Sequence, residues 1–185
     1  MKRAAFLDRD GVINRKAPEG EYVTRWEDVE FLPGVAEATA SLVQAGFSVI
    51  VISNQRCVSK GLLTMSELGS IHQRMCQKLA SSGAVITDGY YCPHDYQPPC
   101  ECRKPAPGLL LTAAREHDID LTASWMIGDS DIDVEAGKKA GCRTARIQMT
   151  GDHARGGADV FADSLFDAVQ QILLITHSLE QVTLL

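Results

Sequence analysis

The sequence lacks the features that mark several classes of protein. Its 185 residues contain 18 lysines and arginines against 24 aspartates and glutamates, so the net charge is −6 and the positive excess of a general nucleic-acid binder is missing. The longest apolar runs, such as Val49–Ile52 and Ile172–Ile175, are far too short to cross a bilayer. The residues before Asp8 leave no room for the apolar region of a signal peptide. We therefore expect a cytoplasmic protein that binds neither membranes nor nucleic acid.

Short apolar segments alternate along the chain with segments of helical periodicity. Strands are expected at 4–7, 47–52, 89–91, 125–127 and 144–147, and helices at 34–45, 64–82, 107–117, 131–140 and 164–175. This alternation predicts an α/β fold: a three-layer, Rossmann-like parallel sheet with helices on both faces. Neither repeats nor low-complexity tracts divide the chain. We expect one domain over residues 1–185, with 176–185 as a tail of unknown role.

Three polar clusters follow the first, second and fourth predicted strands. They are Asp8-Arg9-Asp10-Gly11, Ser53-Asn54-Gln55 and Gly128-Asp129-Ser130-Asp131-Ile132-Asp133. Ligands of open α/β sheets bind at the carboxyl ends of the strands, so these clusters should converge on one crevice. Lys104, in the loop before the fourth strand, can reach the same crevice.

These residue types together are typical of phosphoryl transfer. Packed carboxylates repel one another unless a cation lies among them, and an oxygen-rich site suits Mg²⁺. A lysine and a hydroxyl suit a phosphoryl group. Asp8 can attack phosphorus to form an aspartyl-phosphate, while Asp10 can protonate the leaving oxygen and then activate water. Asp129 would complete the metal site.

Each cluster taken alone has a simpler interpretation. An Asp-x-Asp-Gly segment is often only a turn, and Asp131 and Asp133 also suit the N-terminus of a helix through its dipole. Lys104 beside two prolines can be a solvated loop residue. The catalytic interpretation depends on the occurrence of all these features in order, at strand ends or in adjoining loops.

On these motifs the sequence resembles the haloacid dehalogenase-like (HAD) phosphohydrolase superfamily over roughly residues 4–175. The resemblance implies that Asp8 is the nucleophile and Asp10 the acid/base. It also implies that Ser53 and Lys104 bind the transferring phosphoryl group. An aspartate at position 10, where the family's ATPases have threonine, indicates a phosphatase.

The same resemblance implies the ligands of a catalytic Mg²⁺. They are the Asp8 carboxylate, the backbone carbonyl of Asp10 and the Asp129 carboxylate, with Asp133 in a supporting role.

Too few residues separate Asp10 from Ser53 for a large cap domain. Loops 11–33, 55–63 and 92–103 must therefore cover the site.

A compact set of thiols and one imidazole precedes Lys104. Thiolates and imidazole are the usual tetrahedral ligands of Zn²⁺, which predicts a structural zinc in a loop over 92–106. The expected ligands are Cys92, His94, Cys100 and Cys102. The alternative is a loop of reduced thiols, since cysteines one residue apart are poorly placed for a mutual disulfide. A zinc here would hold Arg103 and Lys104 rigidly over the crevice.

The zinc loop narrows the resemblance to one branch of the superfamily. The segments CPH…CxCRKPxPG, RDGVIN and SNQ resemble the branch of D-glycero-D-manno-heptose 1,7-bisphosphate phosphatases and histidinol-phosphate phosphatases. Segment 55–64 and the standalone length favour a heptose 7-phosphatase that supplies lipopolysaccharide precursors. The short zinc loop favours a histidinol-phosphate phosphatase of histidine biosynthesis. The sequence also departs from the pattern of the branch at Cys57, which replaces a glycine often found after SNQ-x.

Candidate substrate ligands are Asn54 and three cations. Arg103, Arg56 and Lys60 are placed to meet a distal phosphate or hydroxyl group, although Arg56 and Lys60 are equally compatible with solvated surface charges. The expected substrate is a small phosphorylated metabolite, and the expected state a monomer.

Two other classes are less compatible with the residues. A receiver domain would need an aspartate at the end of strand 89–91, where none is found. A nucleic-acid 3′-phosphatase of the same superfamily is disfavoured by the acidic balance and by the lack of a stripe of basic and aromatic residues.

Overall fold

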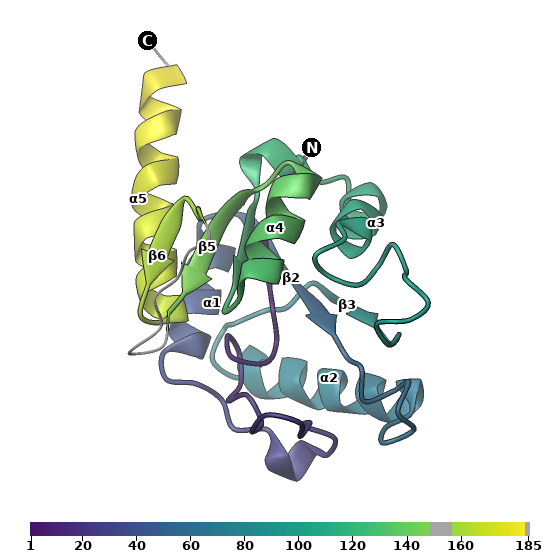
Figure 1. The fold of residues 1–185 in the computed structure, drawn as a ribbon. Helices are drawn as coiled ribbons and strands as arrows, with labels where there is room; N and C mark the ends of the chain where they lie inside the picture. Colours follow the sequence, from purple (N-terminus) through teal and green to yellow (C-terminus); the bar gives the residue numbers. More distant parts are fainter. Residues whose placement is uncertain (149–156, 184–185) are drawn as a thin grey trace.

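The computed structural model describes residues 1–148 and 157–183. In this part of the chain six parallel strands form a sheet in the order β3-β2-β1-β4-β5-β6 (Figure 1). The strands are Arg3–Leu7 (β1), Phe47–Asn54 (β2), Asp88–Cys92 (β3), Trp125–Gly128 (β4), Arg143–Ile147 (β5) and Val160–Ala162 (β6). The helices are Val35–Gln44 (α1), Met65–Ala80 (α2), Gly108–His117 (α3), Asp131–Ala140 (α4) and Leu165–Thr183 (α5). Two 3-10 turns span Trp26–Asp28 and Leu121–Ala123. The predicted α/β fold is confirmed.

Helices cover both faces of the sheet, which confirms the three-layer arrangement. One core cluster joins the sheet to α1, α2 and α5 and includes Leu42, Met75 and Val169. The other joins it to α3 and α4 and includes Leu110 and Ala136. Because both faces of the central strands β1, β2 and β4 are buried, these strands consist almost entirely of apolar residues.

Local capping residues determine where several helices begin and end. Thr64 and Glu67 form the predicted capping box at the start of α2, with both reciprocal hydrogen bonds. Gly141 ends α4 with a φ of +89°, a conformation that favours glycine. A second capping box, formed by Ser130 and Asp133 at the start of α4, was not predicted.

The structure differs from the predicted elements at β6, at the end of α5 and at the end of β2. Strand β6 was not predicted, because three residues at a sheet edge carry too short an apolar pattern. Helix α5 continues through 176–183, which was predicted as a tail, and in Figure 1 it projects beyond the sheet. Strand β2 runs to Asn54, so Ser53 and Asn54 belong to the strand itself. None of the helices in the described part of the chain has the length and apolar composition that crossing a bilayer requires.

Candidate active site and cysteine cluster

The carboxyl ends of β1, β2 and β4 bring the predicted catalytic side chains together. One oxygen atom each from Asp8, Asp129 and Asp133 lies within 4.8 Å of the other two. These carboxylates, with Asp10, are called the carboxylate crevice below. A cleft of about 350 Å³ opens at this edge of the sheet, and Asp8, Asp10, Ser53 and Asp129 line it. The three polar clusters therefore meet at one cleft, as the sequence predicted.

Lys104 is the buried cation of the crevice. Its side chain is 1% exposed, and its Nζ lies 3.0 Å from Asp8 Oδ1 and 2.6 Å from Asp133 Oδ1. The same nitrogen donates a hydrogen bond to the backbone oxygen of Ile52 at 2.8 Å. Burial on its own lowers the pKa of Lys104, but the charges of Asp133 and Asp8 outweigh it and raise that pKa. The two carboxylates thus favour the charged form of Lys104, which is the form that its predicted contact with a phosphoryl group requires.

Burial has the opposite effect on the carboxylate that faces Lys104. It raises the pKa of Asp8, and the positive charge of Lys104 only partly offsets this rise. The hydrogen bond from Ser53 also lowers the pKa of Asp8, as the charge of Lys104 does. Lys104 and Ser53 therefore favour the ionised form of Asp8, while burial disfavours it.

The carboxylate of Asp10 is held by donors on both of its oxygens. Arg9 donates from Nε to Oδ1 at 3.1 Å and from Nη2 to Oδ2 at 2.9 Å. Asn14 donates to Oδ1 and Gln55 donates to Oδ2, each at 2.9 Å. Gln55 also donates to Ser53 Oγ at 3.1 Å, which ties the end of β2 to Asp10. Arg9 and Gln55 belong to polar clusters that were expected to converge on the crevice, but neither of them, nor Asn14, was predicted to bind Asp10.

Two motif glycines let the loops approach the carboxylates closely. Gly11 has a φ of +88°, and a Cβ at this position would lie 2.3 Å from Asp129 Oδ2. A Cβ on Gly128 would lie 2.1 Å from the Asp133 side chain. Any larger residue at either position would push a crevice carboxylate out of place.

Lys16 is a further cation of the site that sequence reasoning missed. It extends from loop 11–33, and its Nζ lies 2.8 Å from Asp129 Oδ2. Burial raises the pKa of Asp129, and the hydrogen bond from Lys16 opposes this effect. A lone lysine in a polar loop carries no pattern that would have indicated this contact.

The donor set of the crevice fits a hard divalent cation. Asp8, Asp129 and Asp133 offer oxygen atoms close to one another, and Mg²⁺ prefers a small number of carboxylates with water completing its shell. Three carboxylates carry more negative charge than the single buried Lys104 neutralises, so a divalent cation would also relieve their repulsion.

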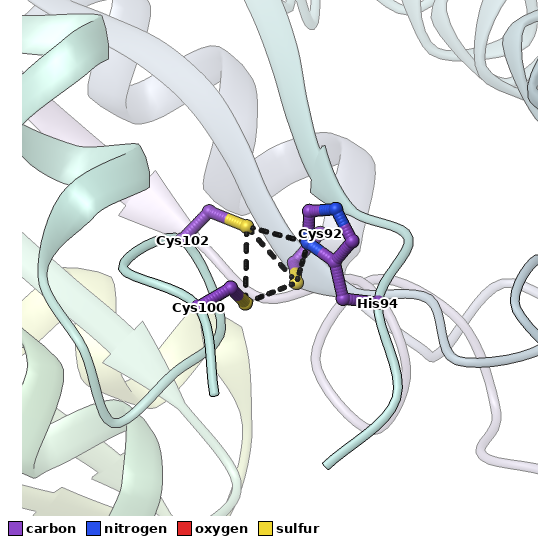
Figure 2. A group of neighbouring side chains, drawn as sticks. All are labelled: Cys92, His94, Cys100 and Cys102. Carbon is purple, nitrogen blue, oxygen red and sulfur yellow. Dashed lines mark hydrogen bonds between the residues drawn. The ribbon is translucent and has the colours of Figure 1, made fainter. Parts of the chain in front are cut away.

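The second cluster contains the four predicted zinc ligands (Figure 2). The sulfur of Cys102 lies 3.2 Å from that of Cys92 and 3.4 Å from that of Cys100, and His94 Nδ1 lies 3.1 Å from it. Cys92 and Cys100 are 3.7 Å apart. A disulfide needs about 2.05 Å, whereas the sulfur–sulfur edge of a zinc tetrahedron with ~2.3 Å bonds is about 3.8 Å. The four side chains therefore fit a single zinc ion.

The cluster ties the cysteine loop (residues 92–106) to the end of β3. Cys92 is buried as the last residue of that strand, and Lys104 follows Cys102 by two residues. Asn54 reinforces the connection from β2: its Nδ2 donates to the Lys104 backbone oxygen and its Oδ1 accepts from the Lys104 backbone N–H, both at 3.0 Å. Asn54 lines the cleft, but its amide is engaged in positioning Lys104.

The three predicted substrate-binding cations lie in different places. Arg103 lines the cleft. Arg56 and Lys60 are not among the residues that line it; each lies over an aromatic ring that does. The Arg56 guanidinium carbon is 4.4 Å from the centre of the Tyr96 ring, and Lys60 Nζ is 5.1 Å from that of Tyr22.

Comparison with known proteins identifies the family to which the chain belongs. A family model described as HAD-hydrolase-like matches residues 101–168. A D-glycero-beta-D-manno-heptose-1,7-bisphosphate 7-phosphatase of Rhodopseudomonas palustris is 42% identical over 152 residues, which cover 78% of this chain and 83% of the relative. The chain belongs to the HAD-like phosphatase family. Membership of this family confirms the resemblance drawn from the four motifs and makes the protein a hydrolase of phosphoric monoesters.

Other members of the family are similar over most of their length. A D-glycero-alpha-D-manno-heptose-1,7-bisphosphate 7-phosphatase of Mycobacterium tuberculosis is 38% identical, with 88% of this chain and 87% of the relative covered. The crystal structure of a D,D-heptose 1,7-bisphosphate phosphatase from B. bronchiseptica, complexed with magnesium and phosphate, superposes with a TM-score of 0.84. That structure is 33% identical and covers 94% of this chain and 99% of its own. A magnesium-bound relative supports Mg²⁺ as the metal of the crevice.

Proposed function

We propose that this protein removes the 7-phosphate of D-glycero-D-manno-heptose 1,7-bisphosphate, in the synthesis of heptose precursors for surface polysaccharide. The names of the similar phosphatases support this substrate. In keeping with the sequence-based expectations, we propose a monomeric, single-domain enzyme of the cytoplasm. Its partner is then a small phosphorylated sugar.

The reaction starts at Asp8. A carboxylate oxygen of Asp8 attacks phosphorus, the bond to the sugar oxygen breaks, and an aspartyl-phosphate forms. Lys104 and Ser53 bind the oxygens of the transferring group. Mg²⁺ held by Asp8, Asp129 and the Asp10 carbonyl, with Asp133 in support, would offset the negative charge on those oxygens.

Asp10 moves the protons of both steps. It donates a proton to the departing sugar oxygen, and the resulting carboxylate then takes a proton from the water that hydrolyses the aspartyl-phosphate. Arg9, Asn14 and Gln55 hold the carboxylate that performs these transfers. Phosphate leaves, and Asp8 and Asp10 return to their initial states.

The observation that favours a bisphosphate over histidinol phosphate is the charge of Arg103. This guanidinium lines the cleft and has no carboxylate partner among the described residues. An uncompensated cation attracts a second phosphate and repels the ammonium group that histidinol phosphate carries in its place. Arg103 is accordingly the proposed ligand of the distal phosphate.

We also propose that the cysteine cluster binds a structural Zn²⁺. The fit of its four side chains to a tetrahedron supports this assignment. The bound ion would then restrain Arg103 and Lys104, which are the first and second residues after Cys102 in the cysteine loop.

The test is phosphate release in the presence of Mg²⁺, with heptose 1,7-bisphosphate and histidinol phosphate at matched concentrations. We expect kcat/KM to be at least about 100-fold higher for the heptose, or ~2.7 kcal/mol in transition-state binding. Both anomers of the heptose substrate belong in the assay, since similar phosphatases are named for each. A preference for histidinol phosphate, or comparably weak rates on both, would contradict the proposal.

A further inference from the structure

One aromatic ring beside the cleft contacts two arginines. The guanidinium carbons of Arg56 and Arg103 each lie 4.4 Å from the centre of the Tyr96 ring. At this distance the π-electron face of the ring attracts a guanidinium. Tyr96 and Arg103 both line the cleft that contains Asp8, whereas Arg56 does not. The ring therefore restrains the Arg103 side chain, together with the hydrogen bond from Arg103 Nη1 to the backbone oxygen of His94.

The two arginines differ in how far their charges are compensated. Arg56 Nε donates to Asp95 Oδ1 at 2.6 Å, and this bond lowers the pKa of Asp95. The backbone N–H of Tyr96 donates to the same oxygen at 2.6 Å. Arg103 donates from Nη1 to the backbone oxygen of His94 at 3.1 Å, and no carboxylate in the described part of the chain pairs with it. The positive charge left over by the group is that of Arg103.

Asp95 is the carboxylate that could cancel this charge. Asp95, Tyr96 and Arg103 together line a second cavity of about 430 Å³ next to the cleft. Asp95 directly precedes Tyr96, whose ring contacts both arginines, and it shares this cavity with Arg103. In the structure the Asp95 carboxylate is engaged by Arg56, with 2.6 Å between Oδ1 and Nε.

We propose that Tyr96, Arg56 and Asp95 are positioning residues that determine substrate specificity through Arg103. Tyr96 orients the Arg103 guanidinium toward the cleft, and Arg56 occupies Asp95 so that Arg103 stays available for a second anionic group of the substrate. This inference rests on the proposed function, because it requires a substrate with a second phosphate.

The first test compares two substrates in each variant. The measured quantity is the ratio of kcat/KM for heptose 1,7-bisphosphate to kcat/KM for 4-nitrophenyl phosphate, which has no second phosphate. Tyr96→Ala should lower this ratio about tenfold, mainly through KM for the bisphosphate, whereas Tyr96→Phe should keep it because the ring remains. An unchanged ratio in Tyr96→Ala, or an equal fall in Tyr96→Phe, would overturn the inference.

The second test examines the role of Asp95. Arg56→Met should lower the ratio although Arg56 does not line the cleft, because Asp95 is then released to pair with Arg103. Adding Asp95→Asn in the double variant should restore it. Arg25→Met is the matched control, since it breaks an exposed arginine–aspartate pair with Asp28, and neither residue lines the cleft. No effect of Arg56→Met, or no restoration by Asp95→Asn, would overturn this part.

The wild-type protein separates failure of this inference from failure of the proposed function. If the wild type prefers histidinol phosphate, the proposed function itself is wrong. If it prefers the heptose bisphosphate while Tyr96→Ala and Arg56→Met keep the wild-type ratio, only the positioning role is wrong.

Discussion

The carboxylate crevice and the cysteine cluster are both suited to a metal, but the chain builds them in different ways. Asp8 follows β1, Asp129 follows β4 and Lys104 comes from the cysteine loop, so the crevice exists only when the sheet is assembled. The cysteine cluster takes all four of its side chains from residues 92–102.

We therefore expect the crevice to determine turnover and the cysteine cluster to determine the structure of its loop. Asp8 and Asp129 lie just beyond the ends of strands whose core consists of other residues, so these two carboxylates can be changed without loss of the fold, whereas Asp133 also caps α4. The cysteine cluster organises a loop that lacks regular secondary structure over 93–107, so its ligands should matter first for local structure.

The largest expected effect is the loss of turnover in Asp8→Asn. Removing the nucleophile should lower kcat by at least about 1,000-fold, while the circular dichroism spectrum and the thermal midpoint stay close to wild type. Asp163→Asn, at an exposed aspartate that does not line the cleft, is the matched control. Wild-type turnover in Asp8→Asn, or failure of this variant to fold, would contradict the view that the crevice serves turnover and not the fold.

A smaller loss of activity, with a larger loss of structure, should follow removal of zinc. Cys100→Ser, or a zinc-selective chelator in the presence of excess Mg²⁺, should expose 92–106 to proteolysis and lower turnover about tenfold, because Lys104 and Arg103 lose their support. Cys142→Ser should retain the metal, since this cysteine is buried outside the cluster. Purified wild-type protein without zinc, and unchanged activity in Cys100→Ser, would show that the loop needs no metal.

Gly11→Ala should weaken metal binding at the crevice specifically. Its Cβ would collide with Asp129 Oδ2, and displacing a ligand should lower Mg²⁺ affinity about 10–100-fold in a calorimetric titration. Gly83→Ala is a strict control: Gly83 also has a positive φ, +75°, but it does not line the cleft and an added Cβ would meet nothing within 4 Å. Equal effects of both substitutions would attribute the loss to backbone strain alone.

The smallest effect concerns a partly buried polar pair, His72 and Tyr91, that lies outside both metal clusters. His72 on α2 forms a 2.7 Å hydrogen bond with the hydroxyl of Tyr91 on β3, and burial lowers the pKa of His72 below its usual 6.5. The folded state thus prefers neutral His72, and this contribution to stability is present above pH 6.5 and is lost as pH falls through the lowered pKa.

His72→Gln should therefore lose less stability than wild type between pH 7.5 and pH 5.5 in denaturant titrations. The exposed His177 gives the control His177→Gln, whose pH dependence should match that of wild type. Parallel pH profiles of wild type and His72→Gln would show that His72 does not link protonation to folding.

Much of the fold and of the candidate site was predictable because the signals are local. Apolar strands between capping residues indicated the α/β order, and the box of Thr64 and Glu67 marks the start of α2 where the structure has it. Four cysteine and histidine side chains within a few residues indicated their own cluster. Four motifs in order, each at a strand end or in an adjoining loop, indicated the crevice, since parallel strands present their carboxyl ends at one edge.

The residues that surround these motifs were not predictable in the same way. Arg9, Asn14 and Gln55 were visible in the sequence, but their donors meet Asp10 only because the loop after β1 turns back beside the end of β2. Lys16 reaches Asp129 across more than a hundred positions of the chain.

Residue types and their spacing thus specified the α/β fold, the motif carboxylates and the cysteine cluster, because each depends on periodicity or on neighbours along the chain. Which cations face the cleft and which are paired elsewhere was decided by tertiary structure alone. Arg56 and Arg103 have the same chemistry, yet Asp95 compensates one and leaves the other available. Such pairings depend on distances between atoms of separate loops, and these distances exist only after the sheet has brought the loops together.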